Sequence, residues 1–162
     1  MAIGFFQSGG GSSNSGEIGI RVERITSQPL TDSAVSIIEF DTLIRNDLGP
    51  TAWSLAQPDA IIIPSGFEGW WSIAAGTYLA GNEAGNNLVV FISQETVSPA
   101  ADTPGAQWRD TTDPIPVHGG AVPDIRYLSE GDIIRLLVFN GATGKSTFGG
   151  GSDPFTFLAL KK

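Results

Sequence analysis

The chain has 162 residues, a formal net charge of −8 and no cysteine. The acidic balance, with no cluster of Lys or Arg, argues against nucleic-acid binding, because phosphate contacts need grouped basic side chains. The missing cysteines exclude a disulfide framework and thiol chemistry. The apolar runs are too short for a transmembrane helix, so we expect a soluble chain with no membrane insertion.

The composition favours strands over helices. Twenty-one glycines and ten prolines, together with many Val, Ile and Thr residues, are typical of short strands joined by turns. Apolar residues make up 41% of the chain and charged residues only 16%, against about 25% charged in typical soluble domains. The length fits one domain with a packed core, and a surface so poor in charge is often partly buried between subunits.

The N-terminal segment differs in composition from the rest. Residues 1–7 carry the apolar side chains of Ile3, Phe5 and Phe6, and residues 8–16 are a Gly/Ser-rich stretch typical of a flexible linker. Such a segment is either a frayed tail or a docking peptide on a tether. Because exposed Phe side chains are a solubility liability, we hypothesise that residues 1–16 form an N-terminal docking peptide with its linker. Residues 17–162 then form the folded domain.

Strand signals follow in chain order through this domain. Alternating apolar and polar residues predict a half-buried strand over residues 18–25. Further strands are predicted over residues 34–44, 60–63, 69–79 and 88–94. Residues 95–124 contain five prolines and few apolar residues, which predicts a long loop, and loops of this length are usually functional or at an interface.

The stretch from Arg126 to Lys162 predicts a very short strand, a polar turn, a strand from Ile133 to Asn140 and a closing strand. Residues 88–94 and 133–139 are apolar at nearly every position, which implies burial on both faces. The second face of these strands would lie against another sheet or another subunit. About eight to ten antiparallel strands, without a helix, predict an all-β sandwich or jelly roll.

Four segments occur in an order that resembles a known family. They are 38–42 (IEFDT), 61–73 (IIIPSGFEGWWSI), 128–136 (LSEGDIIRL) and 155–160 (FTFLAL). This order is similar to that of the C1q/TNF-like jelly rolls and covers residues 18–162. The resemblance implies a homotrimer with aromatic and aliphatic side chains packed around a threefold axis. Because the chain has no collagen-like Gly-X-Y stalk, it looks most like the phage and bacterial versions, which serve as head fibres, decoration proteins or fibre tips.

Large apolar side chains on the predicted strands are candidates for the core or for the trimer interface. Trp70 and Trp71 are adjacent in one strand and therefore face opposite sides, so one belongs to the core and the other to an outer face or the trimer interface. The full set of candidates is Trp70, Trp71, Tyr78, Phe91, Leu136, Phe139, Phe155 and Phe157.

No combination of residues assembles a catalytic or metal site. His118 is the only histidine, so a catalytic triad or a His-based metal site lacks its partners. Residues 144–147 (GKST) would need a glycine at Phe139 and a following helix to cradle a phosphate. Carboxylates in or beside the long loop lack the spacing of a calcium loop, so solvated charges are the simpler interpretation, with calcium binding an open alternative. We expect a non-enzymatic protein with no cofactor.

Surface contact is predicted for Trp108, Arg109 and His118 in the long loop, because aromatic rings stack on sugars and anchor protein interfaces. Packing of that loop onto the sandwich is the plainer alternative. We expect a virion protein: a trimeric decoration or fibre module of a phage, attached through its N-terminus to a capsid or tail protein. The alternative function is a receptor-binding tip domain of a phage tail fibre that contacts a host-surface glycan.

Overall fold

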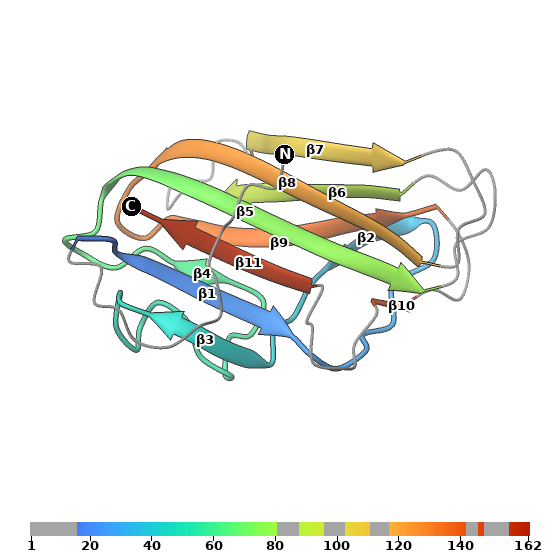
Figure 1. The fold of residues 1–162 in the computed structure, drawn as a ribbon, viewed down its shortest axis with the longest axis horizontal. Helices are drawn as coiled ribbons and strands as arrows, with labels where there is room; N and C mark the ends of the chain where they lie inside the picture. The colour runs from blue at the N-terminus through green and yellow to red at the C-terminus, as the bar shows by residue number, and fades with distance from the viewer. Residues whose placement is uncertain (1–15, 81–87, 96–102, 111–116, 142–145, 148–155) are drawn as a thin grey trace.

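The computed structural model describes residues 16–80, 88–95, 103–110, 117–141, 146–147 and 156–162. Within these residues every regular element is a strand, and the strands form two antiparallel sheets packed face to face (Figure 1). No helix in the described part of the chain is long and apolar enough to cross a membrane. The predicted all-β class is therefore confirmed.

The first sheet has two edge strands, one with a long ladder to its neighbour and one with a short ladder. Its order is β3 (Thr42–Asn46), β1 (Gly19–Arg24), β11 (Thr156–Lys161), β5 (Gly69–Ala80) and β8 (Val117–Leu128), and the two-residue β10 (Ser146–Thr147) also pairs with β5. Strand β5 pairs with β8 over its whole length, from Gly69 opposite Leu128 to Ala80 opposite Val117. Strand β3 makes a short ladder with β1 at the other edge.

The second sheet lies behind the first in Figure 1. Its order is β2 (Ala34–Ile37), β9 (Ile133–Asn140), β6 (Leu88–Glu95) and β7 (Thr103–Asp110), and the two-residue β4 (Ile61–Ile62) also pairs with β9. From β1 to β6 the chain crosses between the two sheets at every connection. These crossings make the two sheets one sandwich with a common core.

The core between the sheets consists of the inward side chains of both. Trp71 and Leu136, both predicted for the core or the trimer interface, are 1% and 0% exposed, and Trp53 is also buried. In β9 buried residues alternate with half-buried ones. The expected burial on both faces therefore holds fully for only one face of this strand, and the side chains of Leu137 and Phe139 stay partly exposed on the other.

Residues 34–44 were predicted as one strand, but the structure divides them into β2 in the second sheet and β3 in the first. The crossing between the sheets carries Ile38 and Phe40, which are 0% and 1% exposed. These side chains fill the space between the sheets, so alternation continues through the crossing although the strand does not.

The predicted loop at residues 95–124 is wrong in its described parts, which contain β7 and most of β8. Prolines suggested a loop because proline cannot donate to a ladder. Pro104 and Pro123, however, lie on β7 and β8, and these are edge strands with a partner on one side only. An edge strand tolerates proline where the missing N–H would face away from its neighbour.

Asp41 lies in the crossing between β2 and β3 and is hydrogen-bonded to the residues that follow β1. Its carboxylate accepts hydrogen bonds from the backbone N–H groups of Ile25 (2.9 Å) and Thr26 (3.0 Å) and from the hydroxyls of Thr26 (2.5 Å) and Thr42 (3.0 Å). Partial burial by itself raises the pKa of Asp41. The hydrogen bonds from Thr26, Ile25 and Thr42 together outweigh it, so the pKa lies below its ordinary value of 3.8.

This lowered pKa predicts a pH-dependent contribution to stability. A carboxylate whose pKa is depressed in the folded state adds stability above its unfolded pKa of about 3.9, and the contribution is lost as the pH falls through the folded-state pKa. We expect Asp41→Asn to lower the free energy of unfolding by about 1–2 kcal/mol at neutral pH, and by progressively less below about pH 4. Urea unfolding over a pH series measures this. Glu130→Gln, at an exposed turn position, is the control, and a loss that is the same at every pH would contradict the electrostatic origin.

Candidate functional site

Strand β8 reverses the usual pattern of a sandwich strand at residues 124–127. Ile125 and Tyr127 point outward and are 69% and 53% exposed, whereas Asp124 and Arg126, which alternate with them, point inward. Trp70 pairs with Tyr127 across the ladder and is 66% exposed. We call Trp70, Ile125 and Tyr127 the β5–β8 apolar face. Monomeric soluble domains rarely place contiguous large apolar side chains in water without a functional reason.

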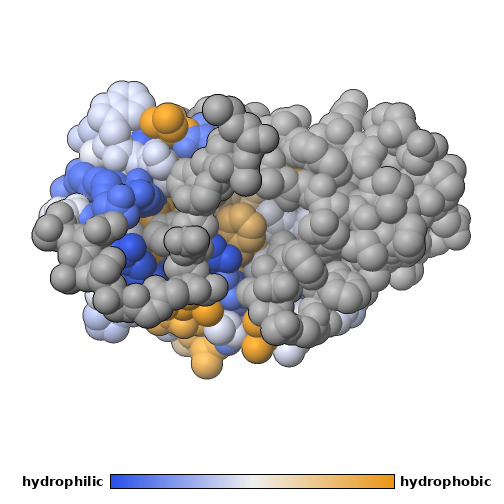
Figure 2. Space-filling view, in the orientation of Figure 1, coloured by the Kyte–Doolittle hydropathy of each residue, from blue (hydrophilic) through white to orange (hydrophobic). Residues whose placement is uncertain are grey.

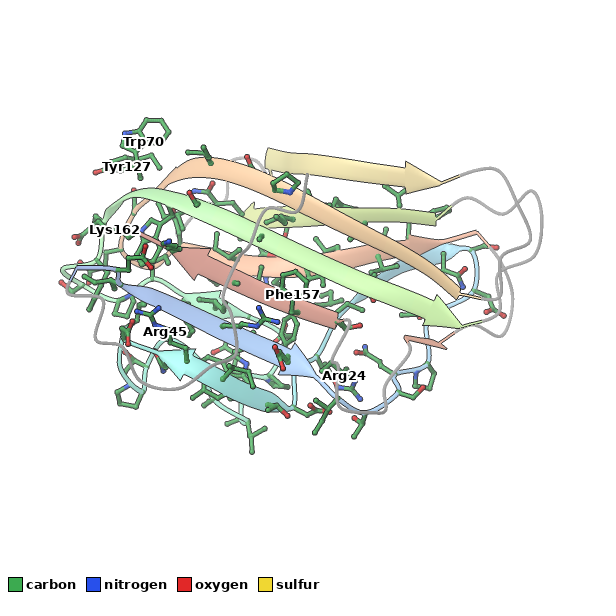
Figure 3. All side chains as sticks on the ribbon, viewed as in Figure 1. Arg24, Arg45, Trp70, Tyr127, Phe157 and Lys162 are labelled. Atoms are coloured by element: carbon green, nitrogen blue, oxygen red, sulfur yellow. The ribbon has the colours of Figure 1, made fainter. Side chains whose placement is uncertain are left out.

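The two aromatic rings of this face hold each other in a fixed geometry. Figure 3 shows Trp70 and Tyr127 side by side, projecting away from the sandwich. Their ring centroids are 5.9 Å apart and the ring planes meet at 84°, the edge-to-face arrangement that aromatic pairs favour. Cross-strand pairing on a ladder limits the freedom of both side chains, so the face is preorganised for contact.

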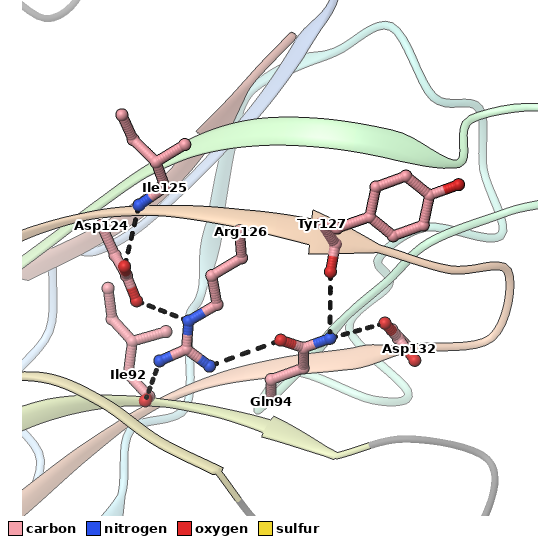
Figure 4. Close-up of polar contacts among 7 residues, drawn as sticks. All are labelled: Ile92, Gln94, Asp124, Ile125, Arg126, Tyr127 and Asp132. Atoms are coloured by element: carbon pink, nitrogen blue, oxygen red, sulfur yellow. Dashed lines mark hydrogen bonds and ion pairs between the residues drawn. The ribbon is translucent and has the colours of Figure 1, made fainter.

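The inward side chains of β8 form a polar network beneath this face (Figure 4). Arg126 Nε donates to Asp124 Oδ2 at 2.5 Å, and Arg126 Nη2 donates to the backbone carbonyl of Ile92 at 3.4 Å. The Arg126 and Asp124 side chains are only 10% and 18% exposed. Because Ile92 belongs to β6, the guanidinium links the edge of the first sheet to the second sheet.

Gln94, also on β6, extends the network to the turn that follows β8. Its Nε2 donates to Asp132 Oδ2 at 2.7 Å and to the backbone carbonyl of Tyr127 at 3.4 Å. Asp132, only 2% exposed, also accepts from the backbone N–H of Ser129 at 2.8 Å. The backbone that carries Tyr127 is therefore fixed from the interior.

The remainder of the outer side of the first sheet carries ion pairs. Arg21 bonds Glu23 at 2.6 Å and places its guanidinium 4.8 Å from the ring centroid of Phe157. Arg45 and Asp47 form a second pair at 2.5 Å. Phe157, predicted for the core or the trimer interface, thus lies half-buried beneath a cation. This part of the sheet is chemically unlike the β5–β8 apolar face.

The other predicted interface residues lie on different surfaces. Trp71 and Leu136 lie in the core, Trp70 on the outer face of the first sheet, and Phe91 and Phe139 half-buried on the outer face of the second. The outer faces of two packed sheets point in opposite directions, so Trp70 and Phe91 lie on opposite sides of the subunit. Tyr78 is on β5, and Phe155 lies outside the described residues.

The predicted surface-contact residues lie on edge strands. Trp108 and Arg109 belong to β7 and His118 to β8; their side chains lie outside the part that the structure describes, as do Ile3, Phe5 and Phe6. Ile125 and Tyr127 were not among the residues predicted from the sequence. The signal was present in Asp124-Ile125-Arg126-Tyr127, where charged and apolar residues alternate with the period of a strand.

No three His, Cys, Asp or Glu side chains within the described ranges gather to hold a metal ion. The site so defined is an apolar surface on a rigid ladder, and contact with another molecule is the chemistry that it offers.

Comparison with known proteins identifies the fold. No protein-family model matches the chain, and no curated protein sequence matches it. The crystal structure of murine APRIL matches with a TM-score of 0.63 at 15% identity, over 90% of this chain and 98% of that one. Eiger TNF from S. frugiperda matches with a TM-score of 0.62 at 14% identity, over 90% of this chain and 92% of that one. These likenesses show a TNF-like jelly-roll fold and confirm the predicted fold class.

The network beneath the β5–β8 apolar face predicts a large effect of one substitution. Arg126→Ala leaves the mostly buried Asp124 carboxylate without its cation, so we expect the free energy of unfolding to fall by about 3 kcal/mol. Arg45→Ala, in the more exposed pair with Asp47 (32% and 40% exposed), is the control and should cost under about 1 kcal/mol. Urea unfolding at one protein concentration measures both. Equal losses in the two variants would contradict the assigned role of Arg126.

Proposed function

We propose that this chain is a non-enzymatic structural module that assembles as a homotrimer through its β5–β8 apolar face. The observation that carries the proposal is the reversed alternation of β8, with Asp124 and Arg126 inside and Ile125 and Tyr127 outside. A side chain such as Trp or Tyr buries about 150–250 Å² when covered. Removing these two aromatic side chains and Ile125 from water in each subunit favours association.

The position of this face favours a closed ring. Strand β8 is an edge strand, so a neighbouring subunit has access to Ile125 and Tyr127 from the side as well as from above. A head-to-tail contact between such an edge and the sheet of the next subunit generates a ring when the rotation closes. The resemblance of the sequence to C1q/TNF-like jelly rolls implies three subunits.

For the biological setting we propose a virus particle, with a phage as the first choice. A trimer that decorates a capsid or a tail gains from avidity, since three weak attachments act together. The apolar residues Ile3, Phe5 and Phe6, followed by the Gly/Ser-rich linker, supply one attachment segment per subunit. The low fraction of charged residues, 16%, suits a protein that functions within an assembly.

The oligomeric state tests the proposed interface. The full chain has a subunit mass of 17.0 kDa. We expect both the full chain and a chain that begins at Glu17 to have about three times their own subunit mass, because the proposed interface lies within the domain. The double variant Trp70→Ser/Tyr127→Ser should be a folded monomer. Leu55→Ser, which alters a side chain that is 70% exposed on a loop, should remain trimeric. Light scattering after size exclusion measures the mass, and a monomeric full chain would overturn the trimer.

Attachment to a virus particle through residues 1–7 can be tested separately from the oligomeric state. Phe5→Asp/Phe6→Asp should abolish co-sedimentation with virus particles that lack this protein while leaving the mass unchanged, because charged residues cannot enter an apolar docking site without loss. Leu55→Ser is again the control. Full co-sedimentation of the charged variant would contradict attachment through the N-terminus.

A host-surface glycan is the alternative ligand. It is supported by the placement of Trp108 on β7 and His118 on β8, two edge strands that lie side by side (Figure 1). Loss of cell binding in Trp108→Ala, with particle attachment intact, would favour this function over the decorating one.

A further inference from the structure

A second apolar surface lies at the opposite edge of the first sheet. Leu43 and Ile44 on β3 are 43% and 54% exposed, and Ile25, just beyond the end of β1, is 44% exposed. We call Ile25, Leu43 and Ile44 the β3 apolar edge. Figure 2 shows apolar surface gathered along the lower margin of the molecule, where Figure 1 places β3.

The local geometry of β3 opposes pairing with a further strand. The ladder with β1 shifts register between Arg21 and Val22, which pair with Arg45 and Leu43, so Ile44 is an extra residue in a bulge. Bulges twist an edge and disrupt a regular ladder. The surface is therefore suited to side-chain packing by an apolar segment rather than to strand addition.

The start of the described chain is tied to the same edge. Arg45 on β3 donates to the backbone carbonyl of Glu17 at 2.5 Å, and the N–H of Gly19 donates to Asp47 at 3.0 Å. The Gly/Ser-rich linker therefore leaves the domain next to the end of β3, and Leu43 is two residues from Arg45. Nine linker residues, 8–16, span up to about 30 Å when extended, whereas the two strand residues from Arg45 to Leu43 span about 7 Å. The linker is therefore long enough for residues 1–7 to reach Leu43.

We propose that residues 1–7 of the chain dock in cis on the β3 apolar edge, with Phe5 and Phe6 packing against Leu43 and Ile44. The segment supplies apolar side chains that can cover this exposed apolar surface. A short Gly/Ser-rich linker holds it near the surface at an effective concentration in the millimolar range. The proposal does not depend on the trimer or on the virion. If the same segment also attaches the protein to a particle, the docked form is its resting state and attachment requires its release.

Methyl NMR on the full chain tests this. In the full chain we expect nuclear Overhauser contacts from the Phe5 and Phe6 rings to the methyl groups of Leu43 and Ile44. Removing residues 1–16 should shift the methyl signals of Ile25, Leu43 and Ile44, and Phe5→Ser/Phe6→Ser should reproduce those shifts. A synthetic peptide of residues 1–8 should restore the original signals of the shortened chain only at about millimolar concentration. The methyl signals of Ile125, on β8 at the opposite edge of the first sheet, serve as the control.

Two results would overturn the proposal. Unchanged Leu43 and Ile44 signals after removal of residues 1–16 would show that the segment does not lie there. Signals that move with serial dilution of the full chain, but not of the shortened chain, would show that the segment docks on a second copy. Neither result bears on the trimer, because the mass of the chain beginning at Glu17 decides that separately.

Discussion

The ion pair between Asp124 and Arg126 occupies the inward side of β8, where a sandwich strand ordinarily places apolar side chains. Burying two charges costs desolvation energy, which is recovered only when both are well paired and hydrogen-bonded. Here the carbonyl of Ile92 supplies a further partner for the guanidinium. Since side chains alternate along a strand, the inward charges force Ile125 and Tyr127 outward. The apolar outer face of β8 at this point therefore follows from the two charged side chains on its inward side.

Several charged side chains in the described part of the chain are paired within the subunit. Arg21 pairs with Glu23, Arg45 with Asp47, and Arg135 bridges Asp59 and Glu95. Burial alone would lower the pKa of Arg135, but its bonds to Glu95 and Asp59 raise it, so this cation stays charged in its half-buried position. Charges that are paired within one subunit contribute little to long-range steering of a partner. Under the proposed function, association through the β5–β8 apolar face therefore relies on apolar contact and shape.

The sequence allowed the fold class and the opposite facing of neighbouring strand residues to be predicted, because their signals are local. Adjacent Trp70 and Trp71 had to face opposite sides of one strand, and the structure places one at 66% and the other at 1% exposure. The edge strands were missed because Pro104 and Pro123 resemble loop residues until the neighbouring strands are known. Whether a proline is tolerated depends on which side of its strand is unpaired, and that is a property of the assembled sheet. The prediction placed residues up to Asp124 in a loop and began a very short strand at Arg126, whereas β8 runs from Val117 to Leu128, so the reversed alternation across Asp124 and Arg126 could not be recognised.

The two edges of the first sheet impose a limit on assembly. A subunit with two separate apolar surfaces that both accept another copy forms open chains or filaments rather than closed rings. The β5–β8 apolar face and the β3 apolar edge lie at opposite ends of the sheet order, which is the arrangement that permits such growth. Covering Leu43 and Ile44 with residues 1–7 of the same chain removes one of these two surfaces from contact with other copies. Because the bulge in β3 already opposes strand addition, the proposed trimer forms through the β5–β8 apolar face with or without residues 1–16, and the docked segment serves to shield Leu43 and Ile44 from weak contacts between trimers.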